Sequence, residues 1–215
     1  MIHPAAAYDA LAIVEGLSPD FDTVLDSEVH TLTYLAFLLS LSDGAEPERW
    51  GYGFVATKSA SPFSAAVNAA IIELATAGLL LKRANRLSPA ASAPALLRSW
   101  RALPGNRERC VFLEVALAAA RAISLPLTVR AVQREPQLSR ATELDALRAL
   151  PDELGLLDLL SDFRQVDGVL FEQGLSAEPE RHQALLLSRA HLWLSYLAGE
   201  PDPARTEAEG TPSLA

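Results

Sequence analysis

The chain has 215 residues, of which half are hydrophobic and 21% are charged, and its formal net charge is −9. This composition excludes an intrinsically disordered chain, and the single cysteine, Cys110, excludes an internal disulfide and a zinc site built from cysteines. Alanine, leucine and arginine are abundant, which predicts a mostly α-helical globular protein. Cys110 lies in an apolar helical pattern and is expected to be a small core residue.

The first residues and the apolar segments bear on where the protein resides. The N-terminus MIHPAAAYDA lacks the basic start and apolar run of a secretory signal. Polar side chains such as Glu73 and Glu114 interrupt every apolar segment before it reaches the roughly 20 residues that cross a bilayer. We therefore expect a cytoplasmic protein that makes no contact with a membrane.

Charge is unevenly distributed along the chain. Residues 1–47 carry a net charge of −8, residues 48–109 carry +6, and residues 110–215 carry −7. A basic middle block between acidic flanks predicts a local contact with an acidic partner, or a contact between segments of the chain. The acidic total is unlike the basic balance of a dedicated nucleic-acid-binding protein.

The first predicted elements are two helices and an aromatic segment. Helices are expected over residues 4–17 and 26–42, and the second is apolar around most of its circumference, which predicts a central position in the core. Residues 50–59, WGYGFVATKS, are predicted to be an extended segment or loop. Trp50 and Tyr52 in it can stack on a partner or pack in the core, and the sequence leaves both open.

Residues 61–89 form the most informative stretch. Ser61 is predicted to cap a helix with Pro62 at its first position, and Gly78 to end it in the left-handed conformation. Two short strands follow at 79–83 and 86–88, with Asn85 expected to supply positive φ in the turn between them. A helix followed by a basic hairpin is the order of recognition helix and wing, so residues 1–103 are predicted to be a winged-helix-like domain.

The rest of the chain is predicted to be a helical subdomain over residues 104–199, with Pro104 to Asn106 as the boundary. Residues 200–215 are polar and proline-rich and are expected to be a disordered tail. The helices are expected at about 91–103, 106–123, 138–149, 151–173 and 178–198.

We expect no catalytic residues, no metal site and no cofactor. Residues 51–56 match the G-x-G-x-x-A pattern of dinucleotide-binding turns, but that mechanism needs a preceding strand and a helix that starts at the glycines. Asp158 and Asp162 share a helix face, which could serve an acid–base pair or a cation; an acidic solvated face is the favoured interpretation. His182 and His191 fall on opposite sides of their helix.

The winged-helix interpretation assigns contact residues. Ser64 and Asn68 would face bases, whereas Lys82, Arg83 and Arg86 would face phosphates. The helix itself has no lysine or arginine, and three basic residues are few for a strongly salt-dependent DNA interface unless a dimer doubles them. The same residues, together with Trp50 and Tyr52, are therefore the predicted contacts for either duplex DNA or a partner protein.

The segment that runs from TYLAFLLSLSDG to SPFSAAVNAAIIELATAGLLL resembles the core of the SocA-like, or Panacea, antitoxin and adaptor domains. The resemblance covers residues 31–81 and rests on three matches, namely Tyr34-Leu35-Ala36, Pro62-Phe63-Ser64 and Gly78-Leu79-Leu80. Ala60-Ser61 stands where that family has Tyr-Gly. The resemblance implies a bacterial protein without catalytic activity that binds another protein, often a toxin or a defence component.

Two functions follow as hypotheses. The first is a non-enzymatic regulatory or adaptor protein that binds a partner protein through its helical region and aromatic loop. The alternative is a dimeric winged-helix transcription regulator that binds duplex DNA. An enzyme that uses Asp158 and Asp162 is disfavoured.

Overall fold

The structure is a computed structural model that describes residues 3–143, 147–151, 153–172 and 182–199. It is mostly helical, as predicted, with two small antiparallel sheets. The elements in chain order are α1 (Pro4–Leu17), β1 (Val24–Leu25), α2 (Asp26–Ser42), the 3₁₀ helix η1 (Pro47–Trp50), β2 (Phe54–Ala56), β3 (Pro62–Phe63), α3 (Ala65–Thr76), β4 (Leu80–Arg83), β5 (Arg86–Pro89), α4 (Ala93–Arg101), α5 (Pro104–Ile123), α6 (Leu125–Gln133), α7 (Pro136–Glu143), β6 (Arg148–Leu150), α8 (Glu153–Glu172) and α9 (His182–Ala198).

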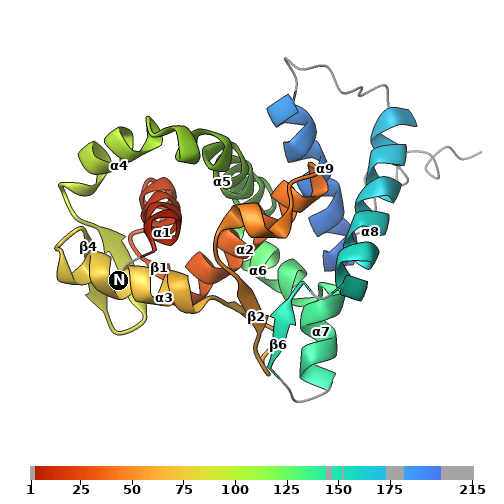
Figure 1. The fold of residues 1–215 in the computed structure, drawn as a ribbon, viewed down its shortest axis with the longest axis horizontal. Coiled ribbons are helices and arrows are strands. Elements are labelled where there is room, and N and C mark those ends of the chain that lie inside the picture. Colours follow the sequence, from red (N-terminus) through yellow and green to blue (C-terminus); the bar gives the residue numbers. More distant parts are fainter. Residues whose placement is uncertain (1–2, 144–146, 152, 173–181, 200–215) are drawn as a thin grey trace, which may run out of the picture.

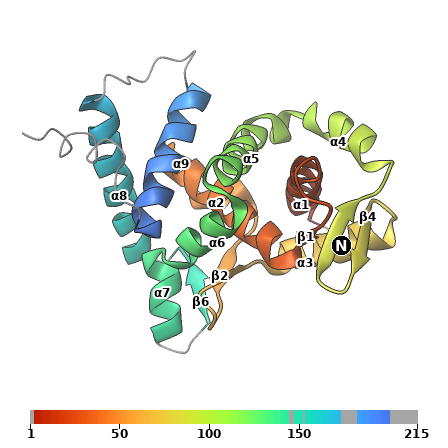
Figure 2. The same ribbon diagram turned by 180° about the vertical axis from the view of Figure 1, so that it is seen from behind.

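Helix α1 lies inside a ring of other elements. It contacts α2, α3, α4, α5 and β5, and both views of the ribbon show it nearly end-on among them (Figures 1 and 2). All of its residues from Ala6 to Val14 are buried, so even its polar Asp9 is enclosed. Helices α8 and α9 lie at the opposite end of the molecule, and α2, α5 and α6 lie between the two ends.

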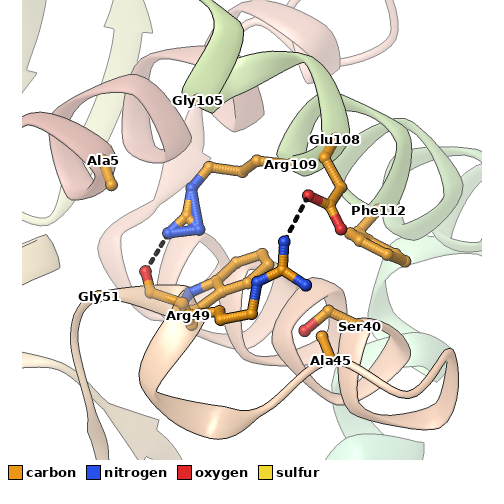
Figure 3. Close-up of a pocket in the computed structure, with 10 residues that line it drawn as sticks. Ala5, Ser40, Ala45, Arg49, Gly51, Gly105, Glu108, Arg109 and Phe112 are labelled. Carbon is orange, nitrogen blue, oxygen red and sulfur yellow. Dashed lines mark hydrogen bonds and ion pairs between the residues drawn. The ribbon is translucent and has the colours of Figure 1, made fainter.

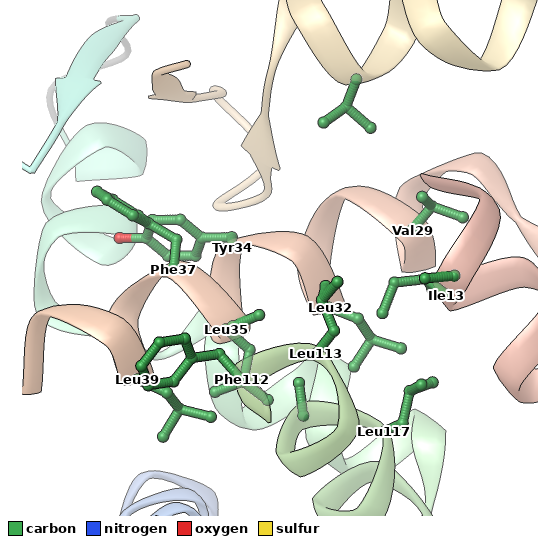
Figure 4. Packing of buried hydrophobic residues seen from close by; sticks show 14 of the residues in the cluster. Ile13, Val29, Leu32, Tyr34, Leu35, Phe37, Leu39, Phe112, Leu113 and Leu117 are labelled. Carbon is green, nitrogen blue, oxygen red and sulfur yellow. The ribbon is translucent and has the colours of Figure 1, made fainter. Parts of the chain in front are cut away.

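The core is one continuous cluster of buried side chains that extends from α1 to α9. Every residue of α2 from Val29 to Leu41 is buried, which confirms the predicted central position of this helix. Figure 4 shows Leu35 and Leu39 of α2 beside Phe112 of α5. Because α5 packs against α1, α2 and α9, the cluster continues across the boundary predicted at residues 103 and 104. The predicted tail, 200–215, lies outside the described residues.

The first sheet contains the predicted hairpin. Strands β4 and β5 pair in antiparallel register, with Lys82 opposite Leu87 and Arg83 opposite Arg86, and β1 adds to the other side of β5. The turn differs from the prediction, because Ala84, at φ +54°, takes the left-handed conformation assigned to Asn85. Gly78 has φ +69° after α3, as predicted.

The second sheet joins distant parts of the chain. Strand β2 pairs with β3 on one side and with β6 on the other, where Val55 lies opposite Ala149. The helix predicted over 138–149 was therefore wrong in its second half, since α7 ends at Glu143 and residues 148–150 form β6. Helix α6 was not predicted; it is separated from α5 by Ser124, whose φ of +90° breaks the helical path.

Candidate functional site

Helix α3 begins later than the sequence suggested. Pro62 belongs to β3, and Ser64 rather than Ser61 is the N-cap, with its Oγ accepting a hydrogen bond from the Val67 N–H at 3.5 Å. The Ser64 N–H donates to Nδ1 of His30 at 3.2 Å, and Ser64 is only 1% exposed. The prediction that Ser64 faces a base was therefore wrong, because its hydroxyl is buried at the helix start.

The outward face of α3 is apolar and neutral apart from one acid. Its exposed residues are Ala65, Ala69, Ile72, Glu73 and Thr76. Ile72, a large apolar side chain, is 51% exposed. Asn68, the predicted adenine contact, is half-buried. This face therefore offers an apolar contact surface and no cation.

The basic residues of the hairpin differ in the contacts that their side chains already make. Lys82 forms an ion pair with Asp26 at the start of α2, so its ammonium group already has an acidic partner. Arg86 donates from Nη1 to Thr23 Oγ1 at 3.1 Å, and both Arg86 and Arg83 are exposed. Leu81, which precedes Lys82, is 56% exposed. The hairpin thus presents two guanidinium groups and one large apolar side chain to solvent.

The aromatic segment faces inward instead of toward a partner. Trp50 is 4% exposed and its ring packs on Phe37, with ring centroids 5.7 Å apart. Tyr52 is half-buried, and its hydroxyl donates to Asp9 Oδ2 at 2.5 Å. The prediction of Trp50 as a surface contact was therefore wrong, and of the two alternatives left open, packing in the core holds for this ring.

Asp9, Trp50, Tyr52 and Arg109 form a buried polar group that we call the Asp9–Arg109 cluster. Arg109 Nε lies 3.2 Å from Asp9 Oδ1, and Nη2 donates to the Trp50 carbonyl. The guanidinium carbon lies 3.9 Å from the centroid of the Trp50 ring, a cation–π arrangement. The cluster ties α1 and α5 to the segment after η1.

Burial governs the electrostatics of this cluster. Asp9 is 0% exposed, and loss of hydration raises the pKa of its carboxyl group to about 7, although the Arg109 charge and the Tyr52 hydrogen bond act in the opposite direction. Burial, and next the charge of Asp9, holds the pKa of Tyr52 well above its ordinary value. The carboxyl group of Asp9 can therefore exchange a proton near neutral pH.

A pocket of about 300 Å³ opens beside this cluster (Figure 3). Arg109 and Trp50 line it together with Gly105 and Phe112, and Arg49 and Glu108 reach toward each other across it. The Arg49 Nη2 and Glu108 Oε2 atoms are 3.3 Å apart, and both side chains are more than 60% exposed. The pocket thus has one buried and one exposed arginine.

The two carboxylates considered for an enzyme, Asp158 and Asp162, lie on α8. Asp158 forms an ion pair with Arg140 at 2.7 Å, and burial raises the pKa of Asp162. Residues 51–53 lead into strand β2, so no helix start presents its amide groups to a pyrophosphate there. No three His, Cys, Asp or Glu side chains among the described residues lie close enough to hold a metal ion.

The sequence analysis missed the Asp9–Arg109 cluster. One signal was present, because Asp9 is the only charged residue between His3 and Val14 in an otherwise apolar helix. A charge in such a helix is buried only when it is paired. Its partner lies a hundred positions along the chain, and no local pattern points to it.

No family model, no curated protein and no solved structure matches this chain. In the described ranges, no single helix is long and apolar enough to cross a membrane; α5 and α6 reach that length and composition only together, as a pair bent by 109°.

Proposed function

We propose that this protein is a non-enzymatic bacterial regulatory or adaptor protein that binds a partner protein through α3 and the β4–β5 hairpin. The observation that carries the proposal is the exposed face of α3, where Ile72 is 51% exposed and no lysine or arginine is present. Contiguous apolar surface on a helix face, here formed by Ile72 with Ala65 and Ala69, is a kind of surface that proteins use to recognise partners. The resemblance of residues 31–81 to SocA-like domains points in the same direction.

The charges around this face indicate the partner's chemistry. Arg83 and Arg86 are exposed at the hairpin, and Leu81 adds a second apolar side chain, 56% exposed. A partner that fits this surface presents an apolar side chain to α3 and acidic residues to the hairpin. Trp50 and Tyr52, which were expected to take part, are held in the Asp9–Arg109 cluster and have no place in this interface.

The test is a substitution of Ile72→Glu in the full chain. Proteins retained by the wild type from a lysate of the encoding organism are purified, and their affinity for the wild type and the variant is measured by calorimetry. We expect at least one protein whose affinity falls about tenfold or more with Ile72→Glu, as for truncation of an interface anchor.

The matched control is Leu157→Glu on α8, which also adds a charge at an exposed apolar position, 65% exposed. This variant should bind the partner as the wild type does. If every retained protein binds the wild type and Ile72→Glu equally well, the proposal is wrong.

Duplex DNA binding by a dimeric winged-helix regulator is the second candidate. The element order α1–β1–α2–α3–β4–β5, with β1 paired to β5, is the order expected of such a domain and favours this candidate. Against it stand the uncharged α3 face and the pairing of Lys82 with Asp26. The DNA-binding function requires an affinity for duplex DNA that falls steeply as the salt concentration rises and is lost in the Arg83→Glu, Arg86→Glu double variant. Fluorescence anisotropy measures this affinity.

A further inference from the structure

The pocket beside the Asp9–Arg109 cluster has the construction of a ligand site. Its walls come from the N-terminal part of α1, the end of α2, η1 and the first turns of α5. Its volume of about 300 Å³ lies at the lower end of the range for small-molecule sites. None of its lining residues belongs to α3 or to the hairpin, so this site is separate from the proposed partner surface.

The buried arginine of the pocket is held in a fixed position. Arg109 is 7% exposed, and its Nε and Nη2 atoms are engaged by Asp9 and by the Trp50 carbonyl. Nη1 takes part in neither contact. A guanidinium that is already oriented and largely removed from water binds an anionic oxygen at little entropic cost.

The exposed arginine of the pocket has a replaceable partner. Arg49 and Glu108 form a surface ion pair at 3.3 Å with side chains 62% and 63% exposed. Such pairs contribute little to stability, so an anionic group in the pocket can take the place of Glu108 at small cost. The first turn of α5 carries no acidic residue and Leu103 makes no side-chain cap there, which leaves the positive end of the helix uncompensated beside Gly105.

Apolar side chains complete the lining. Phe112 of α5, together with Ala5 and Ala45, supplies hydrocarbon surface to the lining. We infer that this pocket binds a small organic anion, with a carboxylate or phosphate group between Arg49 and Arg109 and its apolar part against Phe112. This function goes beyond the partner binding proposed above and does not depend on it.

Calorimetry on the full-length protein tests the inference with phenyl phosphate, benzoate and inorganic phosphate. We expect sub-millimolar binding of phenyl phosphate or benzoate and much weaker binding of inorganic phosphate. If phenyl phosphate binds more tightly than benzoate, the group recognised is a phosphate, and the reverse order assigns a carboxylate; both orders support the site. Failure of both aromatic anions to bind, or equal affinity for inorganic phosphate, overturns the inference.

Two variants with opposite expected effects on binding affinity test the location of the site. Arg49→Gln should weaken binding about tenfold, because a charge-assisted hydrogen bond is lost, whereas Glu108→Gln should strengthen it about threefold, because Arg49 loses its competing partner. Arg98→Gln and Glu73→Gln make the same charge changes at exposed positions outside the pocket, and neither should alter binding. Equal effects of Arg49→Gln and Arg98→Gln would contradict the assignment.

A third variant fills the pocket. A Cβ added at Gly105 meets no heavy atom within 4 Å, so Gly105→Trp is expected to leave the fold intact, which circular dichroism and the melting temperature verify. The added ring should abolish binding of the aromatic anions. Undiminished binding by folded Gly105→Trp would place the anion elsewhere and overturn the inference.

Discussion

Asp9 and Arg109 are ionisable residues inside the protein, where a charge is costly unless it is paired. The carboxyl group of Asp9 is completely enclosed, where it contacts the Arg109 guanidinium and accepts a hydrogen bond from the Tyr52 hydroxyl. The guanidinium also donates to the Trp50 carbonyl and lies over the Trp50 ring. The two residues belong to α1 and α5, so the pair links two of the helices that line the candidate ligand pocket. At the residue scale, proton binding by Asp9 is the property that can be measured most directly.

The Asp9→Asn variant tests this property. The folded state raises the pKa of Asp9 from 3.8 to about 7, so the folded protein binds this proton more tightly than the unfolded chain does. The contribution of Asp9 to stability is therefore fully present below pH 3.8 and is lost as the pH rises toward 7. We expect the stability of the wild type relative to Asp9→Asn to fall by up to about 4 kcal/mol over this range, measured by urea unfolding.

The comparison with Asp9→Asn removes the effect of other titrating groups. Burial lowers the pKa of His30 to about 4 from 6.5, so His30 destabilises the fold as the pH falls through this range, equally in both proteins. Glu73→Gln, which removes an exposed carboxylate from α3, is the control for the loss of an acidic side chain as such. A difference between wild type and Asp9→Asn that stays constant from pH 4 to pH 8 would show that Asp9 does not titrate there.

At the scale of single elements, the start of α3 shows how local signals compete. Ser61-Pro62 and Ser64 both precede the helix, and either serine is a suitable N-cap. The structure uses Ser64 because Pro62 and Phe63 pair with β2 as strand β3, which leaves residues before Ser64 extended. Ser61 instead accepts a hydrogen bond from Gln133 at 3.3 Å.

Substitution of the two serines separates these roles. Ser64→Ala should destabilise the protein by about 1 kcal/mol, because the Val67 N–H at the start of α3 loses its acceptor. Ser61→Ala should cost less than half of that, since no helix depends on its hydroxyl. Denaturant unfolding of the two variants measures the difference, and an equal or larger loss with Ser61→Ala would contradict this assignment of the cap.

The sequence predicted those elements whose boundaries are set by nearby residues. Helices α1, α2 and α5 and the β4–β5 hairpin were found because apolar periodicity, proline positions and the turn lie within each segment. Strands β1 and β6 were missed because two or three residues form a strand only where a distant partner, β5 or β2, accepts them. The Asp9–Arg109 cluster and the pocket beside it were missed for the same reason. The sequence left open whether the Trp50 ring contacts a partner or packs in the core, and only its burial in the structure separates the two alternatives.

At the scale of the whole molecule, α5 connects the packing of the two ends. This helix packs against α1, α2, α6 and α9, so side chains such as Leu113 and Ala116 take part in one core that serves both ends of the chain. A cut at the boundary predicted between residues 103 and 104 would expose the buried faces of α1 and α2 on one side and of α5 on the other. The large apolar area involved makes independent folding of either part unfavourable.

Expression of residues 1–103 and 104–215 as separate chains tests this view. We expect neither fragment alone to unfold cooperatively, because each lacks a large part of the buried cluster, whereas the full chain should show one transition. Thermal melts followed by circular dichroism, with near-ultraviolet spectra for side-chain packing, make the measurement. A cooperative transition of the 1–103 fragment would show that the N-terminal part is a domain of its own.

The pairing of β2 with β6 also determines when the folding of this protein can be completed during translation. Strand β2 is made early, yet its partner at residues 148–150 is synthesised only after α3 to α7. On the ribosome, one edge of β2 therefore stays open while most of the helices are being formed. Because β2 and β6 are far apart in the sequence, this sheet forms late in folding. A nascent chain stalled before residue 148 would therefore expose an unpaired edge of β2 to neighbouring chains.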